Sequence, residues 1–143
     1  MKLLTILFFL TFSTAEWTTD FSKAKTEAIA KSKYILLNFS GSDWCVPCMK
    51  LKKEVLDSEE FLKFSEDKLV LVRADFPRNK KNKLSPEQTK QNEALAEKYN
   101  NEGKFPLTVL VNANGKVMKT WDGYSSSMSI TNMEIEIGKI VHK

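Results

Sequence analysis

The chain contains only two cysteines, Cys45 and Cys48, and two residues separate them. A disulfide between them would close a very short loop, so the chain-entropy model gives it only about 2 kcal/mol of stabilisation before strain is subtracted. Such a bond is a poor covalent brace, but it opens and closes easily. Thiol–disulfide exchange needs this property, because one sulfur attacks a foreign disulfide while its neighbour resolves the mixed intermediate. The spacing therefore favours a redox pair over a structural cross-link.

The segments around the two cysteines predict a strand, a loop and a helix. Residues 34–39 are apolar, with aromatic and branched side chains, and residues 40–43 are typical of a turn. Residues 47–56 begin with proline and carry apolar side chains at helical spacing. We expect Cys45 at the N-terminus of this helix, where the helix dipole lowers a thiol pKa by about 0.2 to 1.5 units. Cys48, one turn further on, should be the buried and less reactive thiol.

The order strand, loop, Trp44-Cys-x-x-Cys48 and helix resembles the active-site region of the thioredoxin family, and the resemblance runs from Phe21 to Val141. Within that family, the sequence from Gly41 onward is most similar to exported bacterial thioredoxin-like proteins. It is also similar to the C-terminal reducing domain of the transmembrane thiol:disulfide interchange protein. The resemblance implies an α/β thioredoxin fold, in which a central mixed β-sheet is flanked by helices on both faces.

Pro106 lies in the second segment to which the resemblance gives a function. In the thioredoxin family a cis proline precedes a strand and faces the cysteine pair, and Pro106 matches that position. The cis form costs a peptide bond before proline only about 0.5 to 1 kcal/mol, so proline is suited to this turn; a trans proline at a strand start is the alternative. The backbone beside it could pair with a substrate peptide as an added strand. We expect Trp44, Phe105 and Pro106 to hold the partner chain.

Five further residues are expected to tune the cysteines. In thioredoxins a buried Asp on the strand before the motif helps to move the proton of the second cysteine, but the nearest residue here, Asn38, cannot titrate. Deprotonation of the Cys48 thiol would then depend on water, on the leaving substrate thiolate or on Asp43. Lys52 either favours the thiolate of the second cysteine or is a solvated edge residue. Val46 and Pro47 would tune the redox potential, and this pair resembles those of reducing family members.

The N-terminal segment has the features of a secretory signal peptide. A basic residue is followed by an apolar core and by small residues that end at Ala15. An apolar core of about ten residues is short for a bilayer span, so we expect cleavage after Ala15, and a retained anchor is the alternative. We therefore predict a signal peptide at residues 1–15, one thioredoxin-like domain at residues 16–143, and a periplasmic or secreted location.

The rest of the chain completes the α/β pattern. Buried strands and an antiparallel hairpin are expected at residues 69–75, 108–111 and 116–121. Amphipathic helices are expected at residues 21–32, 59–64, 86–100 and 126–142. Asp20 is the candidate N-cap of the first of them. Between them, residues 77–86 form a basic loop with two interpretations: a solvated loop held open by its own charge, or a docking patch for an acidic partner. Trp17, in an extended lead-in, either fills a surface groove or is exposed.

Missing residue types narrow the chemistry. The formal net charge of +4 is too small to indicate nucleic-acid binding. The only histidine is His142, near the chain end, which disfavours a cysteine protease with a histidine base. Two cysteines without a nearby histidine make a poor zinc site, but a two-thiolate Cu(I) site stays open. The sequence has no phosphate loop and no recognisable flavin or nicotinamide site. We expect no cofactor except the redox-active disulfide, with electrons arriving by thiol exchange from a donor protein that could be membrane-bound.

These observations predict an extracytoplasmic thiol:disulfide oxidoreductase that acts on protein thiols and disulfides. Reduction of substrate disulfides is the favoured direction, with Cys45 attacking and Cys48 resolving. A disulfide-forming oxidant or isomerase is the enzymatic alternative. A Cu(I) carrier and a peptide-holding module with a thioredoxin fold are the alternatives without catalysis.

Overall fold

A mixed five-stranded β-sheet runs through the computed structural model, which describes residues 14–142. The strand order is β1-β3-β2-β4-β5, and the strands are β1 (Trp17–Thr18), β2 (Tyr34–Ser40), β3 (Leu69–Asp75), β4 (Leu107–Val111) and β5 (Val117–Asp122). β1 and β2 both pair with β3 in parallel, whereas β4 is antiparallel to β2 and to β5. Most of the predicted signal peptide, residues 1–13, lies outside the described residues.

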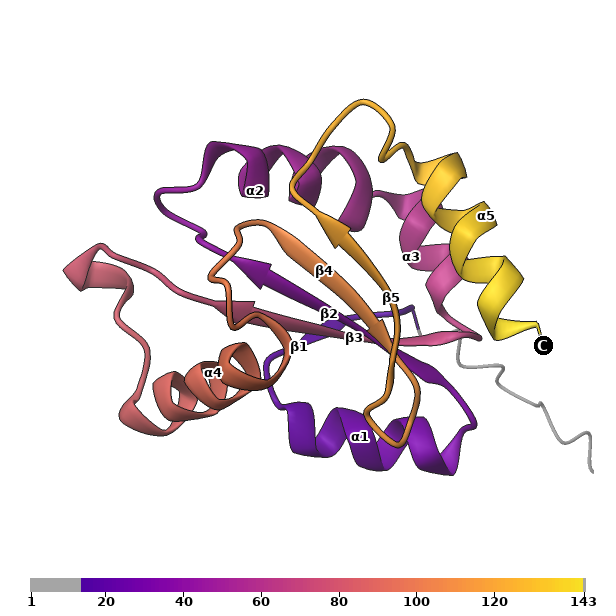
Figure 1. Ribbon diagram of the computed structural model, residues 1–143, viewed down its shortest axis with the longest axis horizontal. Coiled ribbons are helices and arrows are strands. Elements are labelled where there is room, and N and C mark those ends of the chain that lie inside the picture. Colours follow the sequence, from indigo (N-terminus) through magenta and orange to yellow (C-terminus); the bar gives the residue numbers. More distant parts are fainter. Residues whose placement is uncertain (1–13, 143) are drawn as a thin grey trace, which may run out of the picture.

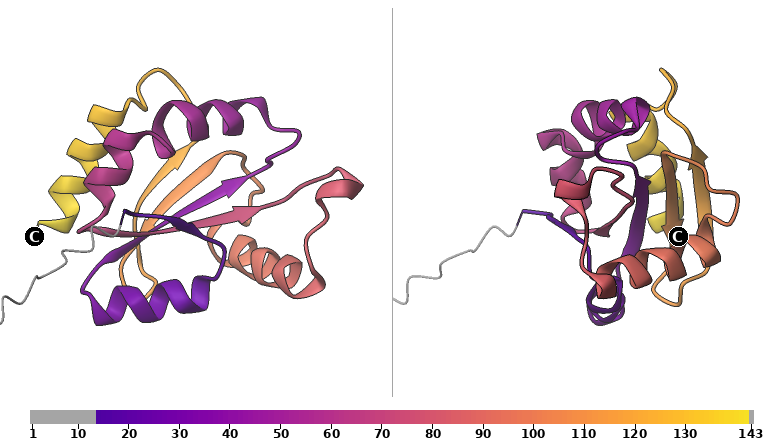
Figure 2. Two further views of the ribbon diagram at one scale, coloured as in Figure 1. Left: turned by 180° about the vertical axis from the view of Figure 1, so that it is seen from behind. Right: turned by 90° about the vertical axis from the view of Figure 1, so that its left-hand side faces the viewer.

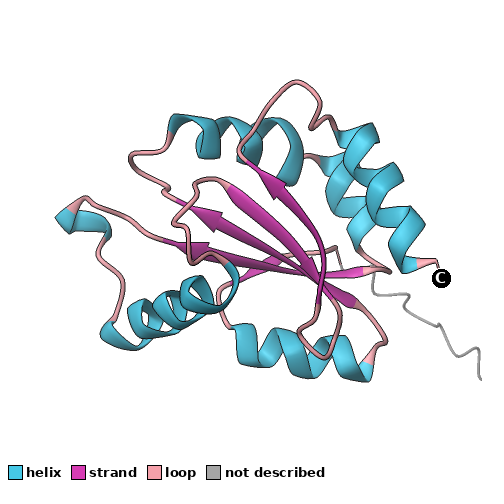
Figure 3. Ribbon diagram, in the orientation of Figure 1, coloured by secondary structure: helices cyan, strands magenta, loops and turns pink. Residues whose placement is uncertain are grey.

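Helices cover both faces of the sheet (Figure 1). One face is covered by α1 (Phe21–Ala30) and α4 (Pro86–Tyr99). The other face is covered by α2 (Val46–Leu51), its π-helical continuation η1 (Lys52–Leu56), α3 (Glu59–Ser65) and α5 (Ile130–Val141). Figure 3 shows the same arrangement, with the strands as one layer between two layers of helices. The expected thioredoxin fold is therefore confirmed, and none of the helices in residues 14–142 is long and apolar enough to cross a membrane.

The alternation of side chains along β2 decides what each face contains. Ile35, Leu37 and Phe39 pack into the apolar core beneath α1 and α4. Leu36 points the other way, into the core beneath α2, α3 and α5. Asn38 follows Leu36 by two residues and therefore shares its face, below the helix that carries the cysteines. Burial of each large apolar side chain contributes about 1.5 to 3 kcal/mol to the free energy of folding, so both cores matter for stability.

The predicted elements are confirmed with small shifts of their ends. Asp20, expected at the start of the first helix, caps α1 by accepting a hydrogen bond from the backbone N–H of Lys23 at 3.0 Å. The two strands around the turn at residues 112–115 form the expected antiparallel hairpin. The single helix expected up to Leu56 is divided instead, because its second half is π-helical.

The structure adds one strand that the sequence did not predict. Trp17, expected in an extended lead-in, belongs to the two-residue edge strand β1 and lies opposite Leu71 of β3. Its indole N–H donates a hydrogen bond to the carbonyl oxygen of Leu56 at 3.3 Å, and the Arg73 guanidinium lies 4.2 Å from its ring centroid. Trp17 is therefore packed rather than exposed, and the lead-in is part of the sheet.

Candidate functional site

Cys45 and Cys48 are joined by a disulfide at the start of α2, with their Cα atoms 5.2 Å apart. Cys45 is the N-cap residue of this helix, and its sulfur accepts a hydrogen bond from the backbone N–H of Cys48 at 3.3 Å. The buried position expected for Cys48 is confirmed, since 3% of the residue is exposed. In this oxidised pair Cys45 is nearly as buried, at 5%, so the expected contrast in exposure is small.

A tight turn before the motif leads from β2 to Cys45. The backbone N–H of Cys45 donates to the carbonyl oxygen of Gly41 at 2.9 Å. A Cβ atom at position 41 would lie only 2.3 Å from the Trp44 ring, closer than real Cβ contacts come. Glycine is needed here because the indole of Trp44 occupies the space that any side chain at position 41 would fill.

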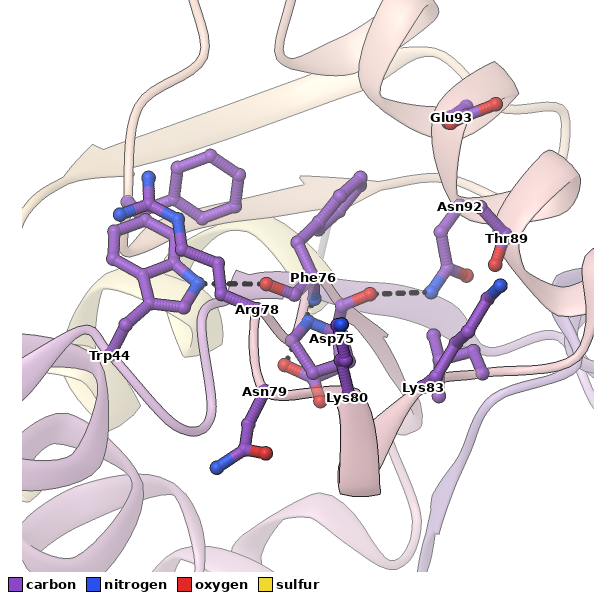
Figure 4. A pocket seen from close by; sticks show the side chains of 13 residues that line it. Trp44, Asp75, Phe76, Arg78, Asn79, Lys80, Lys83, Thr89, Asn92 and Glu93 are labelled. Carbon is purple, nitrogen blue, oxygen red and sulfur yellow. Dashed lines mark hydrogen bonds between the residues drawn. The ribbon is translucent and has the colours of Figure 1, made fainter.

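The three residues before Cys45 are each bound to the last residue of β3 or to the segment that follows it. Ser42 donates to the Asp75 carboxylate through its backbone N–H at 2.9 Å and through its hydroxyl at 2.5 Å. The indole N–H of Trp44 donates to the carbonyl oxygen of Phe76 at 2.7 Å, one of the dashed bonds in Figure 4. Asp43, between them, binds the basic loop. The turn that carries Cys45 is therefore anchored at every residue.

Asp43 connects the basic loop to the motif. Its carboxylate accepts hydrogen bonds from the backbone N–H groups of Arg78 and Asn79, both at 2.9 Å, and from the side-chain amide of Asn82 at 3.0 Å. These bonds, that from Arg78 first, hold the pKa of Asp43 below its usual value. A carboxylate so engaged is a weak base, so the geometry gives Asp43 a positioning role and disfavours Asp43 among the three routes considered for deprotonation of Cys48.

The basic loop, residues 77–86, is therefore exposed to solvent, as one interpretation expected, but its backbone is ordered and not held open by its own charge. The hydrogen bonds to Asp43 and a short 3-10 turn, η2 (Lys80–Asn82), order its backbone. Its lysine side chains are exposed, but the guanidinium of Arg78 lies over the Trp44 ring, 3.7 Å from the centroid. This stack was missed by sequence reasoning, because the two residues are far apart in the sequence and only the docked loop brings them together.

Three aromatic rings meet beside the motif. Trp44 packs against Phe105 with 5.3 Å between ring centroids, and Phe105 packs against Phe76 at 5.4 Å, both edge to face. The Phe105–Pro106 peptide bond is cis, as the sequence predicted. Pro106 leads directly into β4, whose first residue, Leu107, pairs with the last part of β2. The three residues expected to hold a partner chain therefore come together at one end of the sheet.

The backbone before Pro106 is held by residues that sequence reasoning did not single out. The side chain of Asn100, at the end of α4, donates to the carbonyl oxygen of Lys104 at 2.8 Å and accepts from its N–H at 2.9 Å. The Lys104 ammonium binds the carboxylates of Asp122, at 2.8 Å, and Glu102, at 2.9 Å. These partners, Asp122 first, raise the pKa of Lys104 above its usual range. An asparagine at the expected helix end, with Gly103 three residues later, was the available sequence signal.

Asn38 lies below α2 and bonds within the sheet. Its amide donates a hydrogen bond to the hydroxyl of Thr108 at 3.1 Å, and both residues are buried. The two residues face each other across β2 and β4. Asn38, expected from the resemblance to occupy the position of the thioredoxin acid, therefore forms an uncharged, hydrogen-bonded pair with Thr108.

The remaining tuning candidates lie at the surface. Val46 is 59% exposed, and Pro47 is also exposed, so both sit on the outer side of the motif. The side chain of Lys52 is 52% exposed, and its ammonium lies 3.7 Å from the carboxylate of Asp57. This contact favours the solvated edge residue over a role at Cys48. Among residues 14–142 no cluster of three or more histidine, cysteine, aspartate or glutamate side chains could hold a metal ion.

Comparisons with known proteins agree with this geometry. The family model described as a thioredoxin-like domain matches residues 21–133. The disulfide bond reductase DsbH of Chlamydia pneumoniae is 37% identical over 97 residues, which are 68% of this chain and 57% of that relative. The chain thus spans little more than half the length of this curated relative.

Two solved structures extend the comparison to the fold. A structure named DsbH oxidoreductase has a TM-score of 0.71 at 29% identity and covers 87% of this chain and 86% of its own. The oxidised C-terminal domain of Neisseria meningitidis DsbD has a TM-score of 0.58 at 16% identity, with 87% of this chain and 98% of that chain covered. The second likeness shows the fold alone.

Proposed function

The chain belongs to the thioredoxin-like family, and from this membership we propose that it is an extracytoplasmic thiol:disulfide oxidoreductase that reduces disulfides of other proteins. The observation that carries the proposal is the Cys45–Cys48 disulfide at the start of α2. It lies beside the contacting rings of Trp44 and Phe105 and beside Pro106. No structural task needs that bond, because it closes a loop too short to brace the fold.

The proposed reaction is a two-step exchange. In the reduced protein the Cys45 thiolate attacks one sulfur of the substrate disulfide, and the other substrate sulfur leaves as a thiolate. Cys48, as its thiolate, then attacks the Cys45 sulfur; the protein disulfide forms and the second substrate thiolate is released. The substrate gains two electrons and two protons, and the protein loses the same number. The N–H of Cys48, which donates to the Cys45 sulfur in the structure, would stabilise the attacking thiolate.

We propose that the partner chain lies across Trp44, Phe105 and Pro106. The two aromatic rings are in contact and only partly buried, so they offer an apolar surface next to Cys45. The exposed side chain of Val46 would extend that surface on the other side of the attacking sulfur. Pairing of the partner backbone beside Pro106 would orient its disulfide.

The proton of Cys48 must leave without the acid that thioredoxins use. Asn38 does not titrate, and its amide is bonded to Thr108. The Asp43 carboxylate is engaged by the basic loop, and its lowered pKa makes it a poor base. We therefore propose that the leaving substrate thiolate or a water molecule takes this proton.

We propose the reducing direction because the Chlamydia pneumoniae relative is named a disulfide bond reductase and because Val46-Pro47 resembles the pair of reducing family members. No cofactor beyond the disulfide is needed, and a thiol-exchanging donor protein would restore the dithiol. Residues 1–15 would act as a signal peptide and residues 16–143 as one domain, which places the activity in the periplasm or outside the cell.

A single-turnover experiment tests the proposal. The protein is reduced, freed of reductant and mixed with a peptide that contains one disulfide, and the products are alkylated and weighed. We expect one peptide disulfide to be reduced for each Cys45–Cys48 disulfide formed. The Cys48→Ser variant should accumulate a mixed disulfide through Cys45, whereas Cys45→Ser should release no peptide thiol. Failure of the wild-type protein to release any thiol would reject the oxidoreductase.

A further inference from the structure

A cavity of about 500 Å³ opens beside the motif, between the basic loop and α4. Trp44 and Phe105 line it on one side, and these residues are the immediate chain neighbours of Cys45 and Pro106. Figure 4 shows Lys80 and Lys83 reaching toward the cavity from the loop. A polypeptide held at Cys45 would therefore lie next to this opening.

The inner wall of the cavity is apolar and partly exposed. The rings of Trp44, Phe76 and Phe105 all line it, and Leu84 adds an aliphatic side chain from the loop. Each of these residues is only partly buried. An apolar side chain of a partner could cover this surface and displace water from it.

The rim of the cavity carries free positive charge. Arg78, Lys80 and Lys83 line it, and none of the ion pairs formed within residues 14–142 involves any of the three. Two carboxylates also line it. They are Asp75, which also accepts hydrogen bonds from Ser42, and Glu93, so three cations outnumber two acids. The net charge of the rim therefore favours an acidic ligand.

Both walls of the cavity are fixed in place. On the α4 side, Asn92 is buried and its amide donates to the carbonyl oxygen of Asp75 at 2.8 Å, which ties the helix to the end of β3 (Figure 4). On the loop side, Asp43 binds the backbone of Arg78 and Asn79. A preformed site loses less conformational entropy when it binds a ligand. Figure 2 shows that the loop projects past the end of the sheet that carries the motif and then leads into α4.

We propose that this cavity selects the substrates of the reductase: it binds a segment of the partner polypeptide that places a carboxylate next to an apolar side chain, a few residues from the disulfide under attack. The inference rests on the proposed function and adds a substrate class to it. The apolar side chain covers the ring wall, and the carboxylate meets Lys80, Lys83 and Arg78 at the rim. The cavity selects among partner polypeptides when they bind, before the disulfide is attacked. The mechanism of exchange at Cys45 is therefore unchanged.

Three matched peptides test this selection in the single-turnover assay. Each has one disulfide and the same length, and they differ only in a nearby segment: Glu-Leu-Glu, Gln-Leu-Gln or Lys-Leu-Lys. At low salt we expect the pre-reduced protein to reduce the acidic peptide about fivefold faster than the neutral one, with the basic peptide slowest. The preference should shrink in about 0.5 M salt, because salt screens exposed charges. A Glu-Ser-Glu peptide should lose part of the advantage, since serine cannot cover the rings.

Charge reversals within the loop provide the control. Lys83→Glu should remove the preference for the acidic peptide, whereas Lys81→Glu, the same change at a neighbouring lysine that does not line the cavity, should keep it. An equal loss in both variants would indicate general attraction and overturn the proposal. Equal rates for all three peptides in the wild-type protein would overturn it while leaving the oxidoreductase intact. If no peptide were reduced, the proposed function itself would fail.

A competition experiment separates a peptide site from a site for small anions. A cysteine-free Glu-Leu-Glu peptide should slow reduction of the acidic peptide by competition. Inorganic phosphate at the same concentration and ionic strength should not. If phosphate competed equally well, the cavity would bind anions without regard to the apolar side chain, which contradicts the proposal.

Discussion

Two arginine–tryptophan stacks in this protein have the same chemistry but different surroundings. At the edge of the sheet, Arg73 lies 4.2 Å from the ring centroid of Trp17 and forms a 3.0 Å ion pair with Asp57. At the motif, Arg78 lies 3.7 Å from the ring centroid of Trp44, and no carboxylate within residues 14–142 forms an ion pair with it. The arginine of the first stack is therefore paired with a carboxylate. The arginine of the second stack is not paired with one within residues 14–142, and we call this pair, Arg78 and Trp44, the open stack.

The difference separates a structural contact from a surface prepared for a partner. The Arg73 side chain is 16% exposed, so its charge needs a carboxylate within the fold. Arg78 is exposed, and solvent satisfies its charge until another molecule replaces the water. Both indoles donate to a backbone carbonyl oxygen, so each tryptophan is anchored to the fold. The availability of the cation is what distinguishes the motif from the sheet edge.

Replacing each tryptophan with alanine should give the largest contrast. Trp17→Ala removes packing from the core beneath α2, α3 and α5, and we expect it to lower the free energy of unfolding by about 2 to 3 kcal/mol. The rate at which this variant reduces a peptide disulfide should stay within about twofold of wild type, because Trp17 is remote from the proposed partner surface at Trp44 and Phe105. Trp44→Ala should instead slow that reduction by about tenfold, since it removes the ring beside Cys45.

Urea denaturation and the single-turnover assay, run on the same preparations, measure both effects. A Trp44→Ala variant with an unchanged reduction rate would contradict the proposed contact between Trp44 and the partner chain. A Trp17→Ala variant with normal stability would show that β1 contributes nothing to the fold.

Replacing each arginine should give a smaller contrast. Arg73→Ala removes the stack and leaves Asp57 without its 3.0 Å partner, and we expect it to cost about 1 to 2 kcal/mol of stability. Arg78→Ala should cost less than about 0.5 kcal/mol, because an exposed group loses little. It should slow reduction of the acidic peptide about twofold at low salt, because it removes one cation from the edge of the cavity. The single-turnover assay measures this rate. An unchanged rate would contradict the role of Arg78 as a partner contact.

The smallest effect should be a pH dependence of the open stack. Because the pKa of Asp43 is lowered in the folded protein, chiefly by the Arg78 backbone bond, Asp43 holds the basic loop at any pH above its ordinary pKa. This contribution is lost as the pH falls through the lowered folded value. We expect Trp44 fluorescence to change in that acidic range, and Asp43→Asn to abolish the change. A transition above the ordinary pKa of aspartate would contradict the sign of this shift.

The elements and the cysteine pair could be predicted because they depend on local patterns. Apolar runs, helical spacing and the N-cap at Asp20 are local signals, and they placed the main strands and helices with small errors. Trp17 was missed as a strand residue because a two-residue strand has no alternation to detect. The cis proline at Pro106 required the family resemblance, since the residues around it do not distinguish cis from trans.

The support of the site could not be predicted, because it depends on contacts between distant residues. The charge pattern of residues 77–86 predicted repulsion, whereas the backbone N–H groups of that loop bind Asp43, which lies far away in the sequence. Such groups are present in every loop and carry no sequence signal. The sequence left two alternatives for Lys52, a contact that favours the Cys48 thiolate or a solvated edge position, and its exposed ammonium lies near Asp57, as expected for the second.

The redox equilibrium of the Cys45–Cys48 pair tests the central claim most directly. The protein is equilibrated with graded glutathione buffers, and the dithiol fraction is read from the mass increase after alkylation. A reductase should have a potential near about −270 mV, like thioredoxin, whereas a disulfide donor has one near about −120 mV. A value near the second potential would contradict the reducing direction, and a pair that failed to exchange at any glutathione ratio would contradict the oxidoreductase itself.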